Sequence, residues 1–548
     1  MTGAIDAPTM RWWGWGDPTQ PAGLPPYALD YLRESVGIGP RPRPPVALER
    51  VEIAPCTLSA SSLAALREVV GDDGVRDDHA ARVLHAAGKG YPDLVRLRAG
   101  EPDGAPDAIV YPCDHAQVRA VLERCARDSI AVVPFGGGTS VVGGVAPLRG
   151  EHAGVIALDM RRMGNVVELD RESLTVVAQG GMRAPALERY LGARGLTLGH
   201  HPQSFEYVSL GGCAATRSAG QASSGYGSIE KMILGLRLAA PAGDIALAAV
   251  PASAAGPELR RLLVGSEGTC GVIDELSLRV RAAPEERIYE GVFFADFAAG
   301  VDALRALAQQ HAMPDVARLS DVQETRMSLA LAGTGGVKGR LGRAYLGLRG
   351  RGDGACLAIL GFEGERVEFA IRRKRALDLV RDSGGVRVGR SPGEAWRHGR
   401  YSAPYLRDEL LTQGVLVETL ETATQWSNLR RLHRAVGAAI AAALKGQGTP
   451  GLVMCHVSHL YETGASLYFT FIARQREGDE LGQWRAVKEA ASRAILDGGG
   501  TITHHHAIGR DHAPWLEREV GSEGVAALRA LKGELDPSGI MNPGKLLG

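Results

Sequence analysis

The feature that most constrains the fold of this chain is a strand, helix and strand unit that ends in a run of glycines. Residues 107–112 and 130–135 are apolar runs with the length of short buried strands, and the second leads directly into the segment PFGGGTSVVGG at 134–144. Between the two runs, residues 114–129 place apolar side chains at helical spacing behind an aspartate that can cap a helix. Short apolar runs and helical segments alternate as far as about residue 285. This alternation predicts an α+β domain in which one strand leads into a glycine loop.

The glycine loop has the composition of an anion-binding segment. Consecutive glycines allow backbone N–H groups to approach a phosphate closely, and the hydroxyls of Thr139 and Ser140 are further donors. The loop has neither the Gly-x-Gly-x-x-Gly spacing of a dinucleotide-binding helix nor the Gly-Lys-Ser/Thr of a nucleotide-triphosphate loop. On its own, such a run is as compatible with a flexible turn as with a pyrophosphate site.

The chain is too long, at 548 residues, for one ordinary compact core, and its pattern changes along its length. After residue 285 the helical segments become longer, and ASLYFTFIARQ, at 465–475, alternates as a strand does. A stretch rich in glycine and basic residues at 332–354 is predicted to be a loop. The predicted organisation is a helical and irregular N-terminal region (1–102), the α+β domain (103–285), a second domain (286–500) and a C-terminal segment that contains three consecutive histidines (501–548).

Charge and cysteine content narrow the functional class. The formal net charge is zero and the basic residues are scattered, which argues against nucleic acid as a partner. The seven cysteines lie far apart and form no Cys-x-x-Cys pair, which favours a reducing cytoplasm. Because no apolar run is long enough to span a membrane, we expect either a soluble protein or one in peripheral contact with the inner face of a membrane.

Three consecutive histidines, His504, His505 and His506, follow the β-branched run Thr-Ile-Thr. The run predicts a strand, with His504 and His506 on one face and His505 on the other. Imidazoles in this position serve as acid and base groups beside a cofactor, or as metal ligands together with His456 and His459. A surface strand with chance histidines is the third alternative. We expect no bound metal, because no second cluster of carboxylates and histidines accompanies the run.

Three segments of the α+β region occur together in a known family of proteins. They are the glycine loop, GGCAATRSAGQASSGYGSIEKMI at 211–233 and LLVGSEGTCGVIDELSLRV at 262–280. In this order they resemble the FAD-binding domain of the vanillyl-alcohol oxidase superfamily of flavoenzymes. Motifs along nearly the whole chain are also similar to the alkyldihydroxyacetonephosphate synthase family within that superfamily. Among them are MRWWGWGDP (10–18), VLVETLETATQW (415–426) and LDPSGIMNPGKLL (535–547).

The resemblance implies a fold class and a cofactor. The expected fold is α+β: a vanillyl-alcohol oxidase-type FAD-binding domain of two α+β subdomains, an α/β cap domain and a C-terminal segment that returns to the active site. The expected cofactor is FAD held without a covalent bond, although His200 and His201 are residues able to carry a covalent flavin. The implied FAD contacts are Pro134, Phe135, Gly136, Gly137, Gly138, Thr139, Ser140, Gln203, Ser204, Phe205, Ser209, Thr216, Arg217, Ser218, Ala219, Glu267, Gly268, Thr269, Gly271, Val272 and Ile273.

The resemblance also implies a reaction. It is an FAD-dependent, redox-neutral exchange of the acyl group of acyl-dihydroxyacetone phosphate for a long-chain fatty alcohol, which gives the alkyl-dihydroxyacetone phosphate of ether-lipid synthesis. These two substrates are the implied partners, and assembly as a homodimer is compatible with the sequence. One rival is an FAD-dependent dehydrogenase or oxidase of a 2-hydroxy acid or alcohol, which shares the cofactor domain. The other is a flavin-fold protein that binds a lipid or a partner without chemistry.

The resemblance places Tyr468 and the three histidines at the reacting centre and makes Arg407 and Arg318 substrate-binding residues, with Arg407 at the phosphate headgroup. A guanidinium suits phosphate oxygens, and a phenol beside cationic groups is expected to lose its proton more easily than its ordinary pKa of about 10 suggests. The alternatives are structural. They are a packed tyrosine, a surface ion pair between Arg407 and Asp408, and pairing of Arg318 with a carboxylate such as Asp321.

Overall fold

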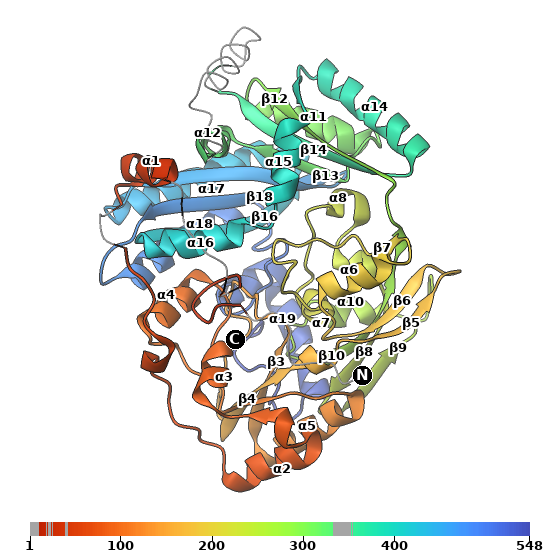
Figure 1. Ribbon diagram of the computed structural model, residues 1–548, viewed down its shortest axis with the longest axis vertical. Coiled ribbons are helices and arrows are strands. Elements are labelled where there is room, and N and C mark those ends of the chain that lie inside the picture. Colours follow the sequence, from red (N-terminus) through yellow and green to blue (C-terminus); the bar gives the residue numbers. More distant parts are fainter. Residues whose placement is uncertain are drawn as a thin grey trace.

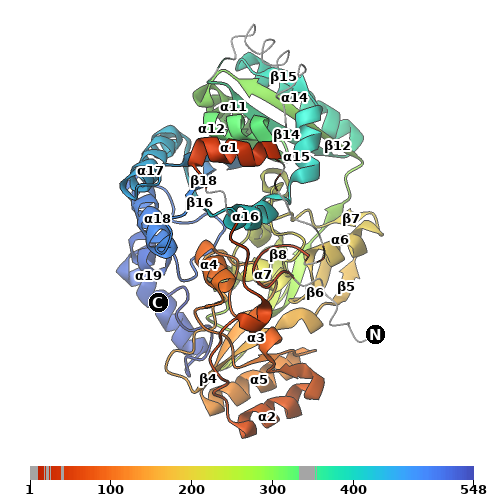
Figure 2. The ribbon, with the colours of Figure 1, turned by 60° about the vertical axis from the view of Figure 1, so that its left-hand side comes forward.

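The computed structural model describes residues 10–17, 19, 24, 26–38, 42–331, 352 and 354–548. Nearly all of the glycine-rich stretch predicted as a loop at 332–354 therefore lies outside the described residues. Two lobes are stacked along the long axis of the molecule (Figure 1), and both views place the predicted α+β domain in the lower one (Figure 2). No helix within the described ranges combines the length and the apolar character that a membrane crossing requires.

The predicted strand, helix and strand unit forms the first half of the lower lobe. In the described residues it belongs to a sheet of order β1-β2-β4-β3, in which β2, β4 and β3 are parallel and β1 pairs antiparallel. Helix α5 (His115–Asp128) begins where the Asp114 carboxylate accepts a hydrogen bond from the backbone N–H of Gln117, as a capping residue does. The other elements of this half are α2 (Ala60–Val70), β1 (Val75–Arg76), α3 (His79–Leu84), α4 (Tyr91–Ala99), β2 (Ala108–Val110), β3 (Ile130–Phe135) and β4 (Gly154–Asp159). Helix α1 (Pro26–Val36) lies in the upper lobe instead (Figures 1 and 2).

The second half of the lower lobe is an antiparallel sheet of order β5-β6-β10-β8-β9 in the described part of the chain. Helices α6 and α7 contribute Leu187, Leu191 and Leu210 to its core, where these side chains are fully buried. The elements are β5 (Val166–Asp170), β6 (Thr175–Gln179), α6 (Ala184–Gly192), β7 (Leu196–Thr197), α7 (Leu210–Ala215), α8 (Ser223–Tyr226), α9 (Ile229–Met232), β8 (Ile233–Ala240), β9 (Gly243–Leu247), α10 (Leu259–Leu263), β10 (Val272–Arg279) and β11 (Arg281–Ala282).

The upper lobe is the cap, built on a sheet of order β15-β12-β14-β13-β17-β18-β16 among the described residues. Its strands pair antiparallel throughout, so its helices do not connect parallel strands as in a βαβ unit. The strands are β12 (Glu286–Phe294), β13 (Val316–Ser320), β14 (Cys356–Gly364), β15 (Val386–Gly389), β16 (Val415–Gln425), β17 (Leu452–Leu460) and β18 (Gly464–Arg474). The helices are α11 (Phe297–Gln309), α12 (Val322–Leu331), α14 (Arg366–Asp382), α15 (Ser391–Gly399), α16 (Ala403–Thr412), α17 (Trp426–Gly446) and α18 (Glu480–Asp497).

Helix α17 shows how the cap core forms. Its leucine, valine and isoleucine side chains recur every three or four residues, which places them on one face, and all of them are fully buried in the cap core. Burial of one such leucine or valine side chain contributes about 1.5–3 kcal/mol of transfer free energy. The residues of this face are Leu429, Leu432, Val436, Ile440 and Leu444.

The C-terminal segment returns from the cap to the lower lobe. Helix α19 (Leu516–Leu535), blue in Figures 1 and 2, packs Leu531 and Leu535 against the core of the second sheet. The chain then reaches the first sheet, where Val132 in β3 donates to the carbonyl of Ile540 and accepts from Asn542 N, both at 2.8 Å. The segment therefore ties the glycine-loop strand to the histidines that precede α19.

Candidate active site

The glycine loop lies where the segments predicted to hold the cofactor meet. A Cβ built on Gly136 would lie 2.2 Å from Ser209 Oγ, and one built on Gly268 would lie 2.9 Å from the Pro134 ring. A Cβ on Gly137 would lie 2.2 Å from the carbonyl oxygen of the nearby residue 207. These approaches are closer than any side chain permits, so the loop depends on glycine. The structure therefore brings the loop against both of the other predicted segments.

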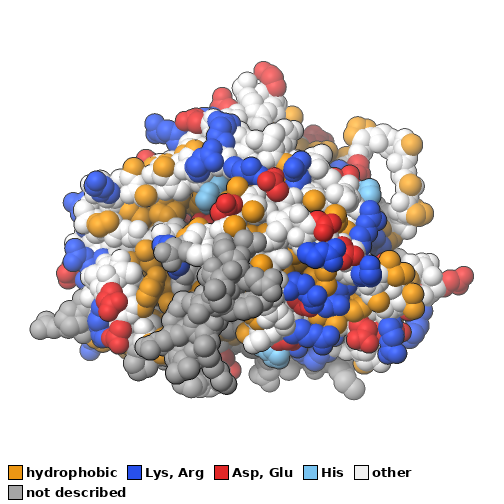
Figure 3. Space-filling model, turned by 90° about the horizontal axis from the view of Figure 1, so that it is seen from above, with side chains coloured by type: hydrophobic (Ala, Val, Ile, Leu, Met, Phe, Trp, Pro, Cys, Tyr) orange, Lys and Arg blue, Asp and Glu red, His pale blue; other side chains and the backbone are white. Residues whose placement is uncertain are grey.

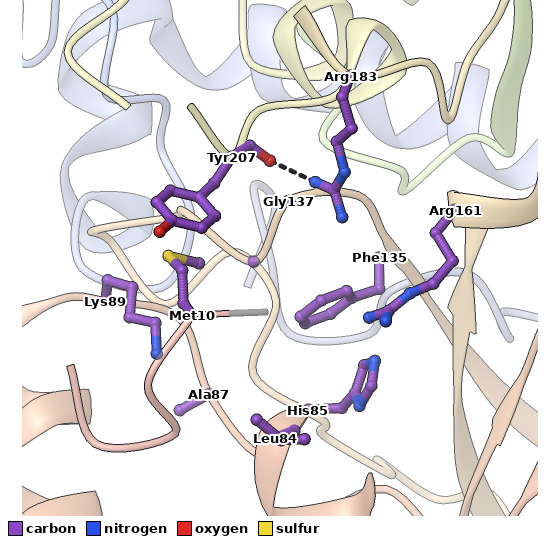
Figure 4. Close-up of a pocket in the computed structure, with 11 residues that line it drawn as sticks. Met10, Leu84, His85, Ala87, Lys89, Phe135, Gly137, Arg161, Arg183 and Tyr207 are labelled. Carbon is purple, nitrogen blue, oxygen red and sulfur yellow. Dashed lines mark hydrogen bonds between the residues drawn. The ribbon is translucent and has the colours of Figure 1, made fainter. Parts of the chain in front are cut away.

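A pocket opens beside this loop, and basic side chains surround it (Figure 4). Asp159 holds two of them, with Arg161 at 2.7 Å and His85 at 2.9 Å, and Lys89 Nζ donates to the carbonyl of Arg11 at 2.9 Å. Backbone N–H groups of glycines and positive side chains are the chemistry that a pyrophosphate requires, so the pocket fits the phosphates of FAD. The lining residues are Met10, Leu84, His85, Ala87, Lys89, Phe135, Gly137, Gly138, Arg161, Arg183 and Tyr207.

Sequence reasoning missed these basic residues. They come from separate stretches of chain that meet only in the fold, and no motif connects them. Arg183 donates to the carbonyl of Tyr207, and burial lowers the pKa of Lys89 to about 8. One sequence signal indicates the site: Arg161 lies two positions after the end of a buried strand of the sheet that carries the glycine loop.

Several buried polar atoms near the predicted cofactor segments have no hydrogen-bond partner within the described part of the chain. Such atoms are rare in native structures unless a ligand or water satisfies them. Gln221 Nε2 donates to Gln203 Oε1 at 2.8 Å, while Oε1 of the same Gln221 is one of the unpartnered atoms. A polar ligand such as FAD fits this region, because its polar atoms supply hydrogen-bond partners. The atoms are His200 Nδ1, His201 Nδ1, Gln221 Oε1, Ser266 Oγ, His506 Nδ1 and Asn542 Oδ1.

Other predicted cofactor residues already have protein partners for their side chains. Arg217 forms an exposed ion pair with Glu230, and the Ser209 hydroxyl caps α7. Thr216 and Thr269 donate to backbone carbonyls at 2.9 and 2.7 Å. Their contact with FAD stays a prediction, and their backbone and location support it more than their side chains do.

The histidine segment is not a strand, so the predicted alternation of faces is wrong. Residues 501–509 have no regular structure, and four of their backbone N–H groups bond to two buried carboxylates instead of a neighbouring strand. Glu421 accepts from the backbone N–H groups of His505 and His506, the latter at 2.8 Å. Glu267 accepts from those of residues 508 and 509, at 2.8 and 2.7 Å. Neither carboxylate was predicted in this role.

The three imidazoles form one cluster instead of lying on opposite faces. The ring centroids of His504 and His505 are 5.2 Å apart, and those of His505 and His506 are 4.9 Å apart. Tyr468 in β18 lies 5.5 Å from His506 and 6.3 Å from His505, and stacks on His456 at 4.9 Å. The four predicted catalytic residues are therefore brought together.

The pKa of Tyr468 differs in direction from the one expected from the sequence. Desolvation raises its pKa above the ordinary value of about 10, and the Thr419 hydrogen bond and the charge of Arg407 offset this only in part. The expectation of a pKa below the ordinary value is therefore wrong, because desolvation outweighs the charge of Arg407. Tyr468 is a protonated donor in the working pH range. Burial also lowers the pKa of His506 to about 3, so that its ring is neutral.

Arg407 lies on α16 and points inward. Its side chain is 8% exposed, and its guanidinium donates to the Lys89 carbonyl at 3.1 Å and faces Glu418 and Thr419 at 3.5 and 3.4 Å. The expected alternative of a surface ion pair with Asp408 is wrong, because Asp408 is itself buried and accepts from Trp15 N at 2.8 Å. The long contacts of Arg407 leave donors for an anionic ligand.

Lys89 connects Arg407 to the glycine loop through its backbone. Its N–H donates to the carbonyl of Ser140 at 2.6 Å, and its own carbonyl accepts from Arg407. The histidine segment is joined to the same loop, because Arg510 N donates to the carbonyl of Val142 at 2.8 Å. The headgroup arginine, the histidines and the loop thus form one connected site.

Arg318 is linked to Tyr468 through other side chains. It pairs with Glu324 at 2.7 Å and not with Asp321, the partner that the sequence suggested. Glu324 in turn bonds His456 Nδ1 at 2.9 Å, and His456 stacks on Tyr468. Burial alone would raise the pKa of Glu324, but Arg318 and His456 bring it down to about 2. Direct contact of Arg318 with a substrate stays a prediction.

Two sets of side chains have the composition of a metal site. The first is His459, His504 and His505, the second is Glu421, His505 and His506, and the ligand atoms of each set lie within 4.8 Å of one another. His504 Nδ1 and His505 Nδ1 are 2.9 Å apart, which is a hydrogen-bond distance. Tetrahedral zinc at about 2.0–2.1 Å from nitrogen keeps its ligand atoms roughly 3.3 Å apart. The spacing favours shared protons over a shared cation.

Comparison with known proteins agrees with this fold. Residues 106–248 match the family described as "FAD binding domain", and residues 283–546 match "FAD linked oxidases, C-terminal domain". Fold and site thus define an FAD-linked flavoprotein of the vanillyl-alcohol oxidase type, with FAD as its cofactor. The predicted fold class is confirmed.

Individual relatives show to which family of FAD-linked flavoproteins the chain belongs. Alkyldihydroxyacetonephosphate synthase of Dictyostelium discoideum is 34% identical over 92% of this chain and 83% of its own length. The enzyme of the same name from Trypanosoma brucei brucei is 33% identical over 98% of this chain and 92% of its own. A solved structure of an alkyldihydroxyacetonephosphate synthase superposes with a TM-score of 0.86 at 29% identity and covers 98% of both chains. The chain belongs to the alkyldihydroxyacetonephosphate synthase family.

Proposed function

We propose that this protein exchanges the acyl group of acyl-dihydroxyacetone phosphate for a long-chain fatty alcohol. The fatty acid leaves and alkyl-dihydroxyacetone phosphate forms, with no net oxidation or reduction. The observation that carries the proposal is the convergence of Tyr468, the three histidines and Arg407 at the glycine loop, in a chain of this family. Product identification tests it: the protein, incubated without oxygen with palmitoyl-dihydroxyacetone phosphate and hexadecanol, is expected to yield the hexadecyl ether and one equivalent of palmitate. Hydrolysis to palmitate without the ether would contradict the proposal.

The proposed role of each site residue follows from the chemistry of its side chain. Arg407 binds the phosphate headgroup through its planar donors, and the protonated hydroxyl of Tyr468 donates a proton or hydrogen bond at the reacting carbon. The histidines accept and return protons, since a neutral imidazole has one nitrogen that accepts a proton and one that donates. FAD, held without a covalent bond by the loop and the basic pocket, supplies the reactive ring when bound.

Arg407→Lys is expected to raise KM for acyl-dihydroxyacetone phosphate by about 10–100-fold. An ammonium keeps the charge but cannot present the paired donors of a guanidinium, and hydrogen bonds to charged groups contribute about 1.5–3 kcal/mol. Steady-state kinetics measure the effect, with the exposed pair residue Arg518 changed to lysine as a control. An unchanged KM in Arg407→Lys would remove Arg407 from the headgroup site.

The rival dehydrogenase reading rests in part on a metal at the histidine cluster, and metal removal tests it. Dialysis against a chelator is expected to leave turnover unchanged, because the short nitrogen–nitrogen contact of His504 and His505 suits a proton better than a cation. Turnover is measured before and after dialysis, with elemental analysis of the same samples. Loss of activity together with loss of one metal per chain, restored by adding that metal, would favour the rival.

We also propose that the protein acts in the cytoplasm and touches a membrane surface, since both substrates carry long acyl or alkyl chains. All seven cysteines are free, as a reducing compartment requires. Helix α14 exposes Val367 and Ile371 beside Lys374 and Arg375, and Lys and Arg side chains lie among apolar ones on that end of the molecule (Figure 3). Flotation with anionic vesicles tests the contact, and sedimentation equilibrium tests the homodimer that the sequence allows.

A further inference from the structure

Glu421 is a buried carboxylate at the centre of the histidine cluster to which the reaction above gives no role. It lies on β16, and the strand register pairs it directly with Tyr468 in β18. Its side chain is 1% exposed. A carboxylate in such a position is costly to bury unless charged or hydrogen-bonding partners surround it.

The partners of Glu421 all come from the histidine segment. The backbone N–H groups of His505 and His506 donate to one carboxylate oxygen, and Nδ1 of His505 is in close contact with the other, which accepts no well-aligned hydrogen bond from the described residues. Nδ1 of His504 lies 3.4 Å from that second oxygen. One oxygen therefore fixes the backbone, while the other faces the imidazoles.

The charge state of Glu421 follows from these neighbours. Burial alone would raise its pKa, but the imidazoles of His505 and His506 and the hydrogen bonds from the segment hold the pKa well below its ordinary value. Glu421 is therefore a carboxylate throughout the working pH range. An ionised carboxylate only accepts hydrogen bonds, so the His505 nitrogen that faces it must carry a proton.

The remaining contacts of the cluster agree with a proton on Nδ1 of His505. Nδ1 of His504, 2.9 Å away, then accepts from the same N–H, and Nε2 of His504 donates to the Tyr461 hydroxyl at 2.5 Å. Each nitrogen in the chain from Glu421 to Tyr461 has one consistent role. Nε2 of His505 is left without a proton, as the basic atom of the ring.

We propose that Glu421 is the positioning residue of this site: it holds His505 with the proton on Nδ1, so that Nε2 is the proton acceptor of the reaction. The role of Nε2 rests on the proposed function, whereas the orientation of the ring does not. The same logic governs a carboxylate behind a catalytic or metal-binding histidine, where the partner fixes both tautomer and ring direction.

Glu267 provides a matched control within the same segment. It is also a buried carboxylate, and it accepts two backbone N–H groups, from Ile508 and Gly509. No imidazole contact of Glu267 occurs among the described residues. Glu421→Gln and Glu267→Gln therefore both disturb the backbone of the segment, but only Glu421→Gln removes the acceptor for His505 Nδ1.

The direct test is the tautomer of His505, read from imidazole nitrogen shifts in the FAD-loaded enzyme labelled with ¹⁵N-histidine. The resonances are assigned by comparison with His505→Asn. We expect a protonated Nδ1 in the wild type and in Glu267→Gln, and a shift toward protonated Nε2 in Glu421→Gln, whose amide donates toward Nδ1. Protonated Nε2 in the wild type, or no change in Glu421→Gln, would overturn the proposal.

Kinetics provide the second readout. In Glu421→Gln we expect kcat to fall about 10–100-fold, as for residues that orient a functional histidine, while KM for acyl-dihydroxyacetone phosphate stays close to that of the wild type. Glu421→Asp keeps an acceptor and is expected to recover part of the loss, and it replaces Glu421→Gln if that variant does not fold. Equal losses of kcat in Glu421→Gln and Glu267→Gln would contradict the proposal, because Glu421 would then only hold the backbone of the segment in place. If His505 has the predicted tautomer but the wild type forms no ether product, the result contradicts the proposed function and leaves the orientation of His505 standing.

Discussion

Tyr468→Phe is expected to lower turnover by about two to four orders of magnitude while FAD remains bound, the range typical of a positioned acid or base. The change removes one hydroxyl and leaves the ring that stacks on His456 at 4.9 Å, so packing is kept. Because burial raises the pKa of Tyr468, the lost group is an O–H donor and not a phenolate. Single-turnover kinetics measure the loss of turnover, and the FAD content of the same sample shows whether the cofactor is still bound.

The control for this variant is a tyrosine outside the site. Tyr190→Phe on α6 removes a hydroxyl from a ring that stacks on the Arg194 guanidinium at 3.7 Å, and turnover is expected to be unchanged. Wild-type turnover in Tyr468→Phe would show that the reacting centre lies elsewhere. An activity that rises with pH in step with a tyrosine pKa below 10 would show that the hydroxyl acts as a base, against the burial argument.

Gly137→Val is expected to abolish FAD binding. A Cβ at this position would lie 2.2 Å from the carbonyl oxygen of Tyr207 and 3.0 Å from the Arg183 guanidinium, so the loop must move away from the pocket. The backbone N–H groups that face the phosphates then lose their places. The ratio of flavin absorbance to protein absorbance after gel filtration measures the loss.

Gly164→Val separates this effect from a general loss of stability. Gly164 also lies in a loop of the lower lobe, has no left-handed backbone, and the nearest atom to an added Cβ is 3.5 Å away. FAD content is expected to stay at the wild-type level. Full flavin occupancy in Gly137→Val would mean that the loop does not hold the cofactor.

Local patterns in the sequence were sufficient to predict the first half of the lower lobe. The helix at 115–128 begins at its capping aspartate, and the second strand ends at Phe135, directly before the glycines, because each signal depends on neighbouring residues. The position of Tyr468 on an alternating strand was equally local. The convergence of Tyr468, Arg407 and the histidines could be expected only from the family resemblance.

Long-range partners explain what the sequence did not show. The run before the histidines has the composition of a strand, yet the N–H groups that follow it, at residues 505, 506, 508 and 509, bond to Glu421 and Glu267, which lie more than 80 and 240 positions earlier. The basic pocket is likewise assembled from Lys89, Arg161 and Arg183, on separate segments. The raised pKa of Tyr468 follows from desolvation, a property of the folded chain alone.

The absorbance of the flavin under strictly anaerobic conditions tests the central claim, redox-neutral exchange, most directly. We expect acyl-dihydroxyacetone phosphate alone to bleach the oxidised flavin band and release fatty acid, and later addition of hexadecanol to restore the band without any electron acceptor. A dehydrogenase must pass two electrons on before its flavin is oxidised again. Recovery of the band only after an acceptor is added, or bleaching by a 2-hydroxy acid while the acyl ester has no effect, would contradict the account.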